Sequence, residues 1–84
     1  MRRISLKDQV IKALDVQWPA FAARHPNLAR AIDRTVLVEH AVACIADTPE
    51  YRDAMEEAVL AGATAAMLAD IVGRFVRRWL SALI

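Results

Sequence analysis

The fold is decided by residues 47–83, which read DTPEYRDAMEEAVLAGATAAMLADIVGRFVRRWLSAL. Thr48 and Pro49 predict a helix start, because threonine can cap a helix and proline suits its first position. Beyond Pro49 a seam of apolar or small residues continues in steps of three and four, as in helices that pack side by side. Its members are Tyr51, Met55, Ala58, Gly62, Ala65, Ala69, Val72, Val76, Trp79 and Leu83. The stretch therefore predicts a long helical region.

This region can take two forms. A single helix fits the unbroken spacing, whereas Gly62 and Thr64 together can end one helix and cap the next. A second apolar line follows the opposite side of the region through Leu60, Met67, Ile71 and Phe75. Two apolar faces imply two neighbours, one within the chain and one outside it. The small residues in the middle of the seam favour a close helix contact.

Shorter helical segments are expected before this region. Ser5 begins a variant of the capping box, which predicts a helix over residues 6–17. Pro19 interrupts helical geometry, so residues 19–24 are predicted as a separate short turn. Residues 27–46 contain neither glycine nor a further proline, and their apolar spacing has the helical period. A second long helix is expected there.

The composition is that of one small all-α domain. The chain has 84 residues, of which 57% are hydrophobic, and it contains two glycines, three prolines and 17 alanines. So few turn-forming residues exclude a many-stranded sheet, and alanine favours helix. We therefore expect residues 1–84 to form a single helical domain, a small bundle of four or five helices.

Cysteine and hydropathy patterns bear on localisation. Cys44 is the single cysteine, which excludes an intramolecular disulfide. The longest run without a charged residue, 58–69, is too short to cross a bilayer as a helix, which takes about 20 residues. The sequence therefore predicts no transmembrane segment and a cytoplasmic protein.

Charge is unevenly distributed, although the net charge is only +1. Residues 1–46 hold seven basic and four acidic side chains, residues 47–70 one basic and six acidic, and residues 71–84 three basic and none acidic. Such a weakly basic chain is not typical of nucleic-acid binding. The opposite charges of the two ends of the 49–83 region instead favour antiparallel pairing of two copies.

No catalytic, metal or cofactor site is predicted. His40, Cys44 and Asp47 have the spacing to share one helix stripe, but a fourth zinc ligand is not signalled nearby. A surface histidine beside a small buried cysteine explains the same residues. The sequence lacks phosphate-binding glycine loops and the common hydrolase motifs. We expect neither a cofactor nor an enzyme.

Glu39 is the one polar residue expected in the core. On a helix running through residues 27–46, it falls between Leu28, Ile32 and Val42 on the apolar face. A buried carboxylate must be paired or protonated. We favour an ion pair or hydrogen bond from another helix over a role as a general acid or base.

Two surface roles remain as alternatives for the basic residues. The stretch 68–82 loosely resembles a helix-turn-helix, with Gly73 at the turn, and a DNA-binding regulator would then use Arg2, Arg3, Lys7, Arg74, Arg77 and Arg78. Residues 74–84 also have the pattern of a basic amphipathic helix that could lie on a membrane surface.

The interpretation that the sequence favours is a non-enzymatic protein-interaction or oligomerisation module. It is expected to form a homodimer, or to bind another helical protein, through the seam in residues 51–83. The alternative is the small helix-turn-helix-like DNA-binding regulator.

Overall fold

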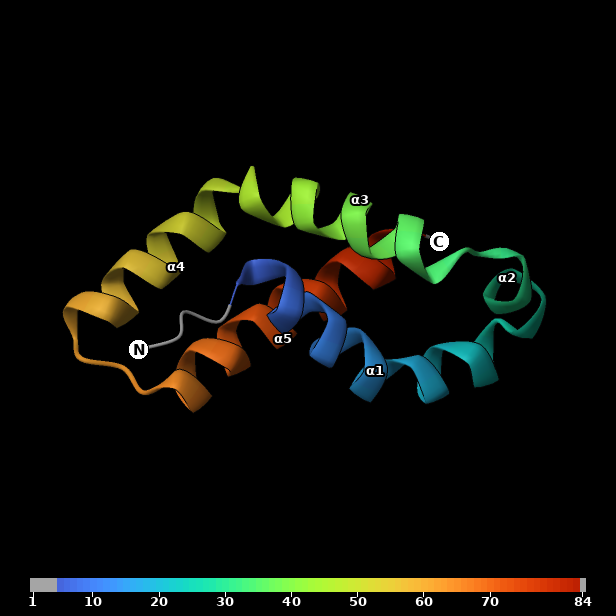
Figure 1. Ribbon diagram of the computed structural model, residues 1–84, viewed down its shortest axis with the longest axis horizontal. Coiled ribbons are helices and arrows are strands. Elements are labelled where there is room, and N and C mark those ends of the chain that lie inside the picture. Colours follow the sequence, from blue (N-terminus) through green and yellow to red (C-terminus); the bar gives the residue numbers. More distant parts are fainter. Residues whose placement is uncertain (1–4, 84) are drawn as a thin grey trace.

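The computed structural model describes residues 5–83, which form five helices and no strand. The helices are α1 (Leu6–Arg24), α2 (Pro26–Ala31), α3 (Arg34–Ala46), α4 (Pro49–Leu60) and α5 (Ala65–Ala82). The prediction of a small all-α bundle is confirmed. Figure 1 shows α1 crossing in front of α5, while α3 and α4 follow each other along the opposite side. The helices α1, α3 and α5 all contact one another, while α2 packs on α1 and α4 packs on α3 and α5.

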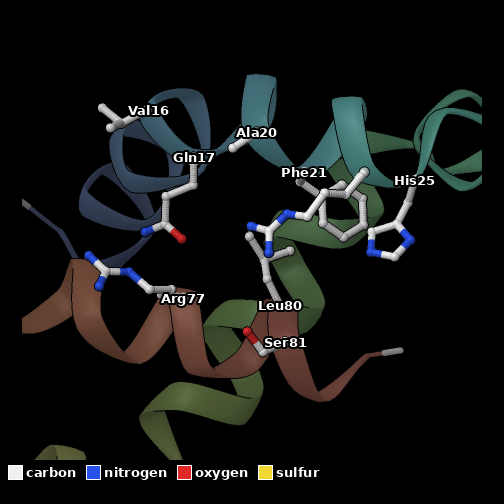
Figure 2. A pocket seen from close by; sticks show the side chains of 9 residues that line it. Val16, Gln17, Ala20, Phe21, His25, Arg77, Leu80 and Ser81 are labelled. Carbon is white, nitrogen blue, oxygen red and sulfur yellow. The ribbon is translucent and has the colours of Figure 1, made fainter.

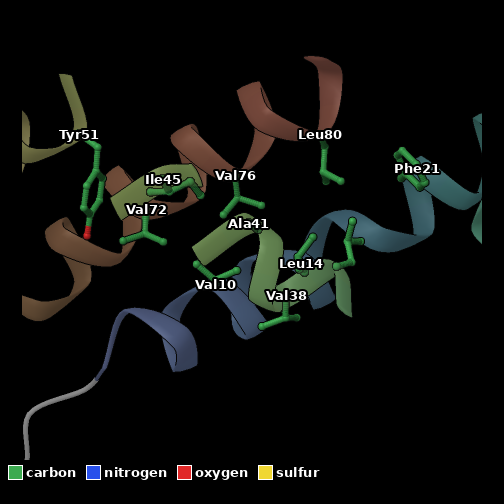
Figure 3. Packing of buried hydrophobic residues seen from close by; sticks show 11 residues of the cluster. Val10, Leu14, Phe21, Val38, Ala41, Ile45, Tyr51, Val72, Val76 and Leu80 are labelled. Carbon is green, nitrogen blue, oxygen red and sulfur yellow. The ribbon is translucent and has the colours of Figure 1, made fainter. Parts of the chain in front are cut away.

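The core lies where α1, α3 and α5 meet (Figure 3). Val10 and Leu14 of α1 and Val72 and Val76 of α5 are fully buried. The face of α3 that packs on them consists of Leu37, Val38, Ala41 and Ile45. Each fully buried aliphatic side chain contributes about 1.5–3 kcal/mol relative to an exposed one. These contacts hold α1 against both α3 and α5.

The first helix begins as predicted but ends later. The Ser5 side chain accepts a hydrogen bond from the backbone N–H of Asp8 at 3.2 Å, as the capping box requires. The helix continues through Pro19 to Arg24, so the predicted break before Pro19 is wrong. Proline removes one backbone hydrogen bond, whereas continuing the helix buries Phe21, which is 5% exposed and stacks on Trp18 with the ring centroids 5.1 Å apart.

The helix predicted over residues 27–46 is two helices. The backbone is extended at Ile32, and α3 starts afresh after Asp33, whose carboxylate accepts the N–H of Thr35 at 2.9 Å. Aspartate is a strong N-cap residue, so this local interaction offsets the interruption of the helix. The buried and exposed faces of α3 therefore do not extend into the short α2.

A break separates α4 from α5, which confirms the two-helix form of the 49–83 region. Gly62 has φ +78°, a backbone conformation that glycine adopts at little cost. The N–H groups of Gly62 and Ala63 donate to the carbonyl oxygens of Val59 and Ala58 at 3.0 and 2.9 Å, the pairing of a Schellman motif. Thr64 then caps α5 by accepting the N–H of Met67 at 3.3 Å. The two helices form a hairpin (Figure 1).

The start of α4 at Pro49 is also confirmed, but Thr48 does not cap it with its side chain. Its hydroxyl instead donates to the carbonyl oxygen of Cys44 at 2.8 Å, back towards α3. The Thr48 side chain thus stabilises the end of α3 and does not bond to the first turn of α4.

Candidate functional site

Much of the predicted seam lies inside the molecule. Tyr51, Val72 and Val76 are buried, and Met55 and Trp79 are partly buried against the same core. In this structure these five side chains pack within the molecule, and the role of the seam as an interface stays a prediction. The physical reason for this internal packing is the break at Gly62, which folds α4 back so that its half of the seam packs on α5. The ring of Tyr51 meets Phe75 edge-on at 5.5 Å between centroids.

The rest of the seam is available to a partner. Gly62, Ala65, Ala69 and Leu83 are exposed, and Ala58 is partly exposed. Ala65 and Ala69 line a hollow surface together with Ala13 and Val16 of α1. We call this surface the α1–α5 groove.

The α1–α5 groove has two hollows. The proximal hollow, about 550 Å³, is lined by Gln9, Lys12, Ala13, Val16, Gln17, Ala65, Ala69, Asp70, Gly73, Arg74 and Arg77. The distal hollow, about 420 Å³, is lined by Val16, Gln17, Ala20, Phe21, Arg24, His25, Arg77, Leu80 and Ser81. Because Val16, Gln17 and Arg77 line both hollows, the two form one continuous surface.

Gln17 lines both hollows and joins α1 to α5 through a hydrogen bond. Its side-chain amide donates to the carbonyl oxygen of Gly73 on α5 at 2.9 Å. Gly73 has no side chain, and no atom lies within 4 Å of where its Cβ would be. The floor of the groove is therefore open here.

Polar groups surround an apolar floor in the distal hollow. Figure 2 shows Phe21 projecting from α1 and Leu80 from α5, with Arg77 and Ser81 also on α5 and His25 at the end of α1. Arg24 also lines it, and no acidic residue does. Two guanidinium groups near a hollow without a carboxylate form a positive site that attracts anionic groups.

The proximal hollow combines charge with exposed apolar surface. Lys12, Arg74 and Arg77 supply three positive charges against one acid, Asp70. The side chain of Val16 is 80% exposed and lies beside the small residues of α5.

The outer face of α4 carries the opposite charge. Asp53, Glu56 and Leu60 follow one stripe of the helix on the side away from the buried Tyr51, and Leu60 is 81% exposed. Within residues 5–83 the one ion pair joins Arg34 to Asp15, so neither the acids of α4 nor the arginines of α5 are paired. We call the stripe of Asp53, Glu56 and Leu60 the α4 row.

Glu39 is exposed, which contradicts its predicted burial. The buried face of α3 is set by Leu37, Val38, Ala41 and Ile45, and Glu39 lies on the other side of the helix. The prediction assumed that Leu28 and Ile32 belonged to the same helix as Glu39. The break at Asp33 removes them from that face.

The stripe of His40, Cys44 and Asp47 makes no metal site. No group of three possible ligands that could hold a metal ion occurs among the described residues. Cys44 is a free, exposed thiol and not the small buried residue that we expected. His40 contacts Trp79 with ring centroids 6.2 Å apart.

The helix-turn-helix interpretation is wrong in its geometry. Gly73 lies in the middle of α5, which continues without a turn from Ala65 to Ala82. Helical geometry at Gly73 is held by the packing of Val72 and Val76 on either side of it. Arg2 and Arg3 lie outside the described residues. None of the described helices combines the length and apolar character that spanning a membrane requires.

A second apolar groove, which was not predicted, lies beside the N-terminal half of α3. It measures about 360 Å³ and is lined by Leu28, Ile32, Asp33, Val36, Leu37, His40 and Leu83. Three helices contribute to it, and only their packing brings these residues together. Local sequence patterns carry no signal for it.

Comparison with known proteins gives no match: no family model, no curated protein and no solved structure is similar to this chain.

Proposed function

We propose that this chain is a non-enzymatic protein-interaction module that self-associates through the α4–α5 hairpin. The observation that carries the proposal is the pairing of two unsatisfied surfaces on one small molecule. The α1–α5 groove is basic with an apolar floor, and the α4 row is acidic with an exposed leucine. Complementary surfaces on one chain favour association of two copies.

Exposed apolar side chains around the hairpin support the same proposal. Val59, Leu60 and Met67 at the tip of the hairpin are 60%, 81% and 57% exposed. Isolated exposed apolar residues are normal, but these three are close in sequence and border the turn. Burying them in a complex would add hydrophobic stabilisation to the electrostatic attraction.

We place the module in the cytoplasm. Its free thiol at Cys44 is exposed, and such a thiol stays reduced in that compartment. A role without catalysis agrees with the distal hollow, where Ser81 and His25 both line the wall but no hydrogen bond joins them in the described part of the chain.

Sedimentation equilibrium tests the proposal directly. The wild-type chain, of 9.3 kDa, is expected to increase in average mass with concentration through the tens of micromolar. High salt should weaken the association without abolishing it, because part of the attraction is screened and part is hydrophobic. A strict monomer throughout this range would overturn the proposal.

A substitution in the groove sharpens the test. Ala65→Glu places a larger, acidic side chain among the small residues of α5. It should lower the association constant at least tenfold, because the partner no longer fits the groove. Ala43→Glu is the matched control, since Ala43 is equally an exposed helical alanine but lies on the outer side of α3. Equal association of both variants would show that the groove is not the contact.

A further inference from the structure

We propose that the α4 row of one copy docks in the α1–α5 groove of a second copy, antiparallel to the partner's α5, and that the exchange is reciprocal. This inference rests on the proposed function and specifies its contact. It follows from the charge, the spacing and the length of the two surfaces.

The α4 row has the form of a helix that inserts into a groove. Asp53, Glu56 and Leu60 are spaced by three and four residues, so they project from one face. The opposite face of α4 is held on the chain's own core by Tyr51, which is 8% exposed. The row is therefore presented on a formed helix and needs no unfolding to bind.

The groove is long enough for the row and opposite to it in charge. At 1.5 Å per residue the row from Asp53 to Leu60 spans about 10 Å, which fits within the roughly 18 Å that α1 covers from Lys12 to Arg24. Within that stretch the groove offers a basic residue near each end, with Arg77 of α5 between them. The acids of α4 have no intramolecular partner that would compete for them within the described residues.

The order of residues sets the direction of docking. The apolar end of the row, Leu60, fits the proximal hollow, where Val16 and Ala69 are exposed and apolar. The acidic part of the row then extends towards the distal hollow, where Arg77 lies and no acid competes. Since α5 runs from the proximal to the distal hollow, α4 must run the other way, antiparallel to the partner's α5.

Reciprocity follows from the size of the contact. One short helix in a groove covers less than the roughly 800 Å² per partner of a stable interface. Each copy carries both the row and the groove, so a twofold dimer makes the contact twice. A dimer of this kind satisfies the charges of both α4 helices at once.

Exchange of charges between Glu56 and Arg77 tests the pairing. Glu56→Lys and Arg77→Glu should each weaken self-association at least tenfold, because both contacts of the homodimer then bring like charges together. An equimolar mixture of the two variants should recover association close to wild type. In that heterodimer one contact pairs Lys with Glu and the other keeps the wild-type pair. Sedimentation equilibrium, with one variant carrying a dye, measures all three constants.

Two matched controls separate the contact from net charge. Glu39→Lys makes the same charge change as Glu56→Lys on the outer side of α3, and Lys7→Glu matches Arg77→Glu on a side of α1 that does not line the groove. Both controls should associate within about threefold of wild type, as expected for screened surface charges. Thermal melts of each variant check that folding is unchanged.

The outcomes distinguish this inference from the proposed function. If the wild type associates but the mixture stays as weak as its components, the docking of α4 in the groove is wrong and self-association stands. The same conclusion holds if the controls weaken association as much as the groove variants do. If the wild type is a strict monomer, both the inference and the proposed function are overturned.

Discussion

The hydroxyl of Thr48 donates its hydrogen to the carbonyl oxygen of Cys44, one turn earlier in the chain, at 2.8 Å. This bond satisfies one of the free carbonyl groups at the end of α3. It also turns the Thr48 side chain away from the N–H groups that open α4. The N-terminus of α4 is therefore left without a side-chain cap.

Thr48→Asp is expected to raise the free energy of unfolding by about 0.5–1 kcal/mol. Aspartate cannot donate to the Cys44 carbonyl and is free to accept from the first turn of α4, where the helix dipole favours its charge. Thr48→Ala, which offers neither interaction, should lower the same quantity by about 0.5 kcal/mol. Urea titration of the two variants and the wild type gives the comparison. A loss with aspartate would show that the bond to Cys44 outweighs a cap.

Substitution of the two glycines by alanine should have opposite effects. At Gly62 the positive φ strains any L side chain, so Gly62→Ala should cost about 1–2 kcal/mol. Gly73 lies within α5, so Gly73→Ala should gain about 0.5–1 kcal/mol from helix propensity. No atom lies within 4 Å of either added Cβ, which removes steric clashes from the comparison. Thermal melts that change in the same direction would contradict this assignment.

Stability should fall in alkaline solution through the single tyrosine. Burial disfavours the phenolate and raises the pKa of Tyr51 above its ordinary value. As pH rises, Tyr51 therefore ionises in the unfolded chain before it ionises in the folded protein. The contribution of Tyr51 to stability is intact below a pH of about 10 and is lost as pH rises towards the native pKa. Because Tyr51 is the one tyrosine in the chain, ultraviolet titration of the phenolate reads it directly. Tyr51→Phe should remove this part of the pH dependence.

Replacement of Glu39 should be nearly neutral. Glu39 is exposed and makes no ion pair in the described part of the chain, so Glu39→Ala and Glu39→Gln should each change the free energy of unfolding by less than about 0.5 kcal/mol. Chemical denaturation of both variants at low protein concentration measures this. A loss of about 2 kcal/mol or more in the alanine variant alone would indicate a partner for the carboxylate.

Local signals identified the starts of α1 and α4 and marked the turn before α5 as one of two possible forms. Ser5 caps α1, Pro49 opens α4, and the pair of Gly62 and Thr64 marks the turn of the hairpin, because each of these roles depends on a few neighbouring backbone groups. The break at Asp33 had a signal of the same kind, an aspartate able to cap, but the continuous apolar spacing around it suggested one helix.

Features that depend on tertiary packing were beyond the sequence patterns. Pro19 stays inside α1 because Phe21 beyond it reaches the core, which no local rule can anticipate. The seam of residues 51–83 keeps its spacing through the turn, so periodicity alone does not show that its halves face each other. The α1–α5 groove likewise requires the relative position of two helices that are distant in the chain. The small residues on α5 were its one sequence signal.

The attachment of α4 has a consequence for how the molecule opens. This helix packs on α5 and on the end of α3 but makes no contact with α1, and Tyr51 is its one buried residue. Such a segment can detach by local unfolding while the three-helix core stays intact. In native-state hydrogen exchange, the amides of α4 should therefore lose protection at a lower free energy than those of α5. We therefore expect two cooperative units in the molecule, with the acidic row on the less stable one.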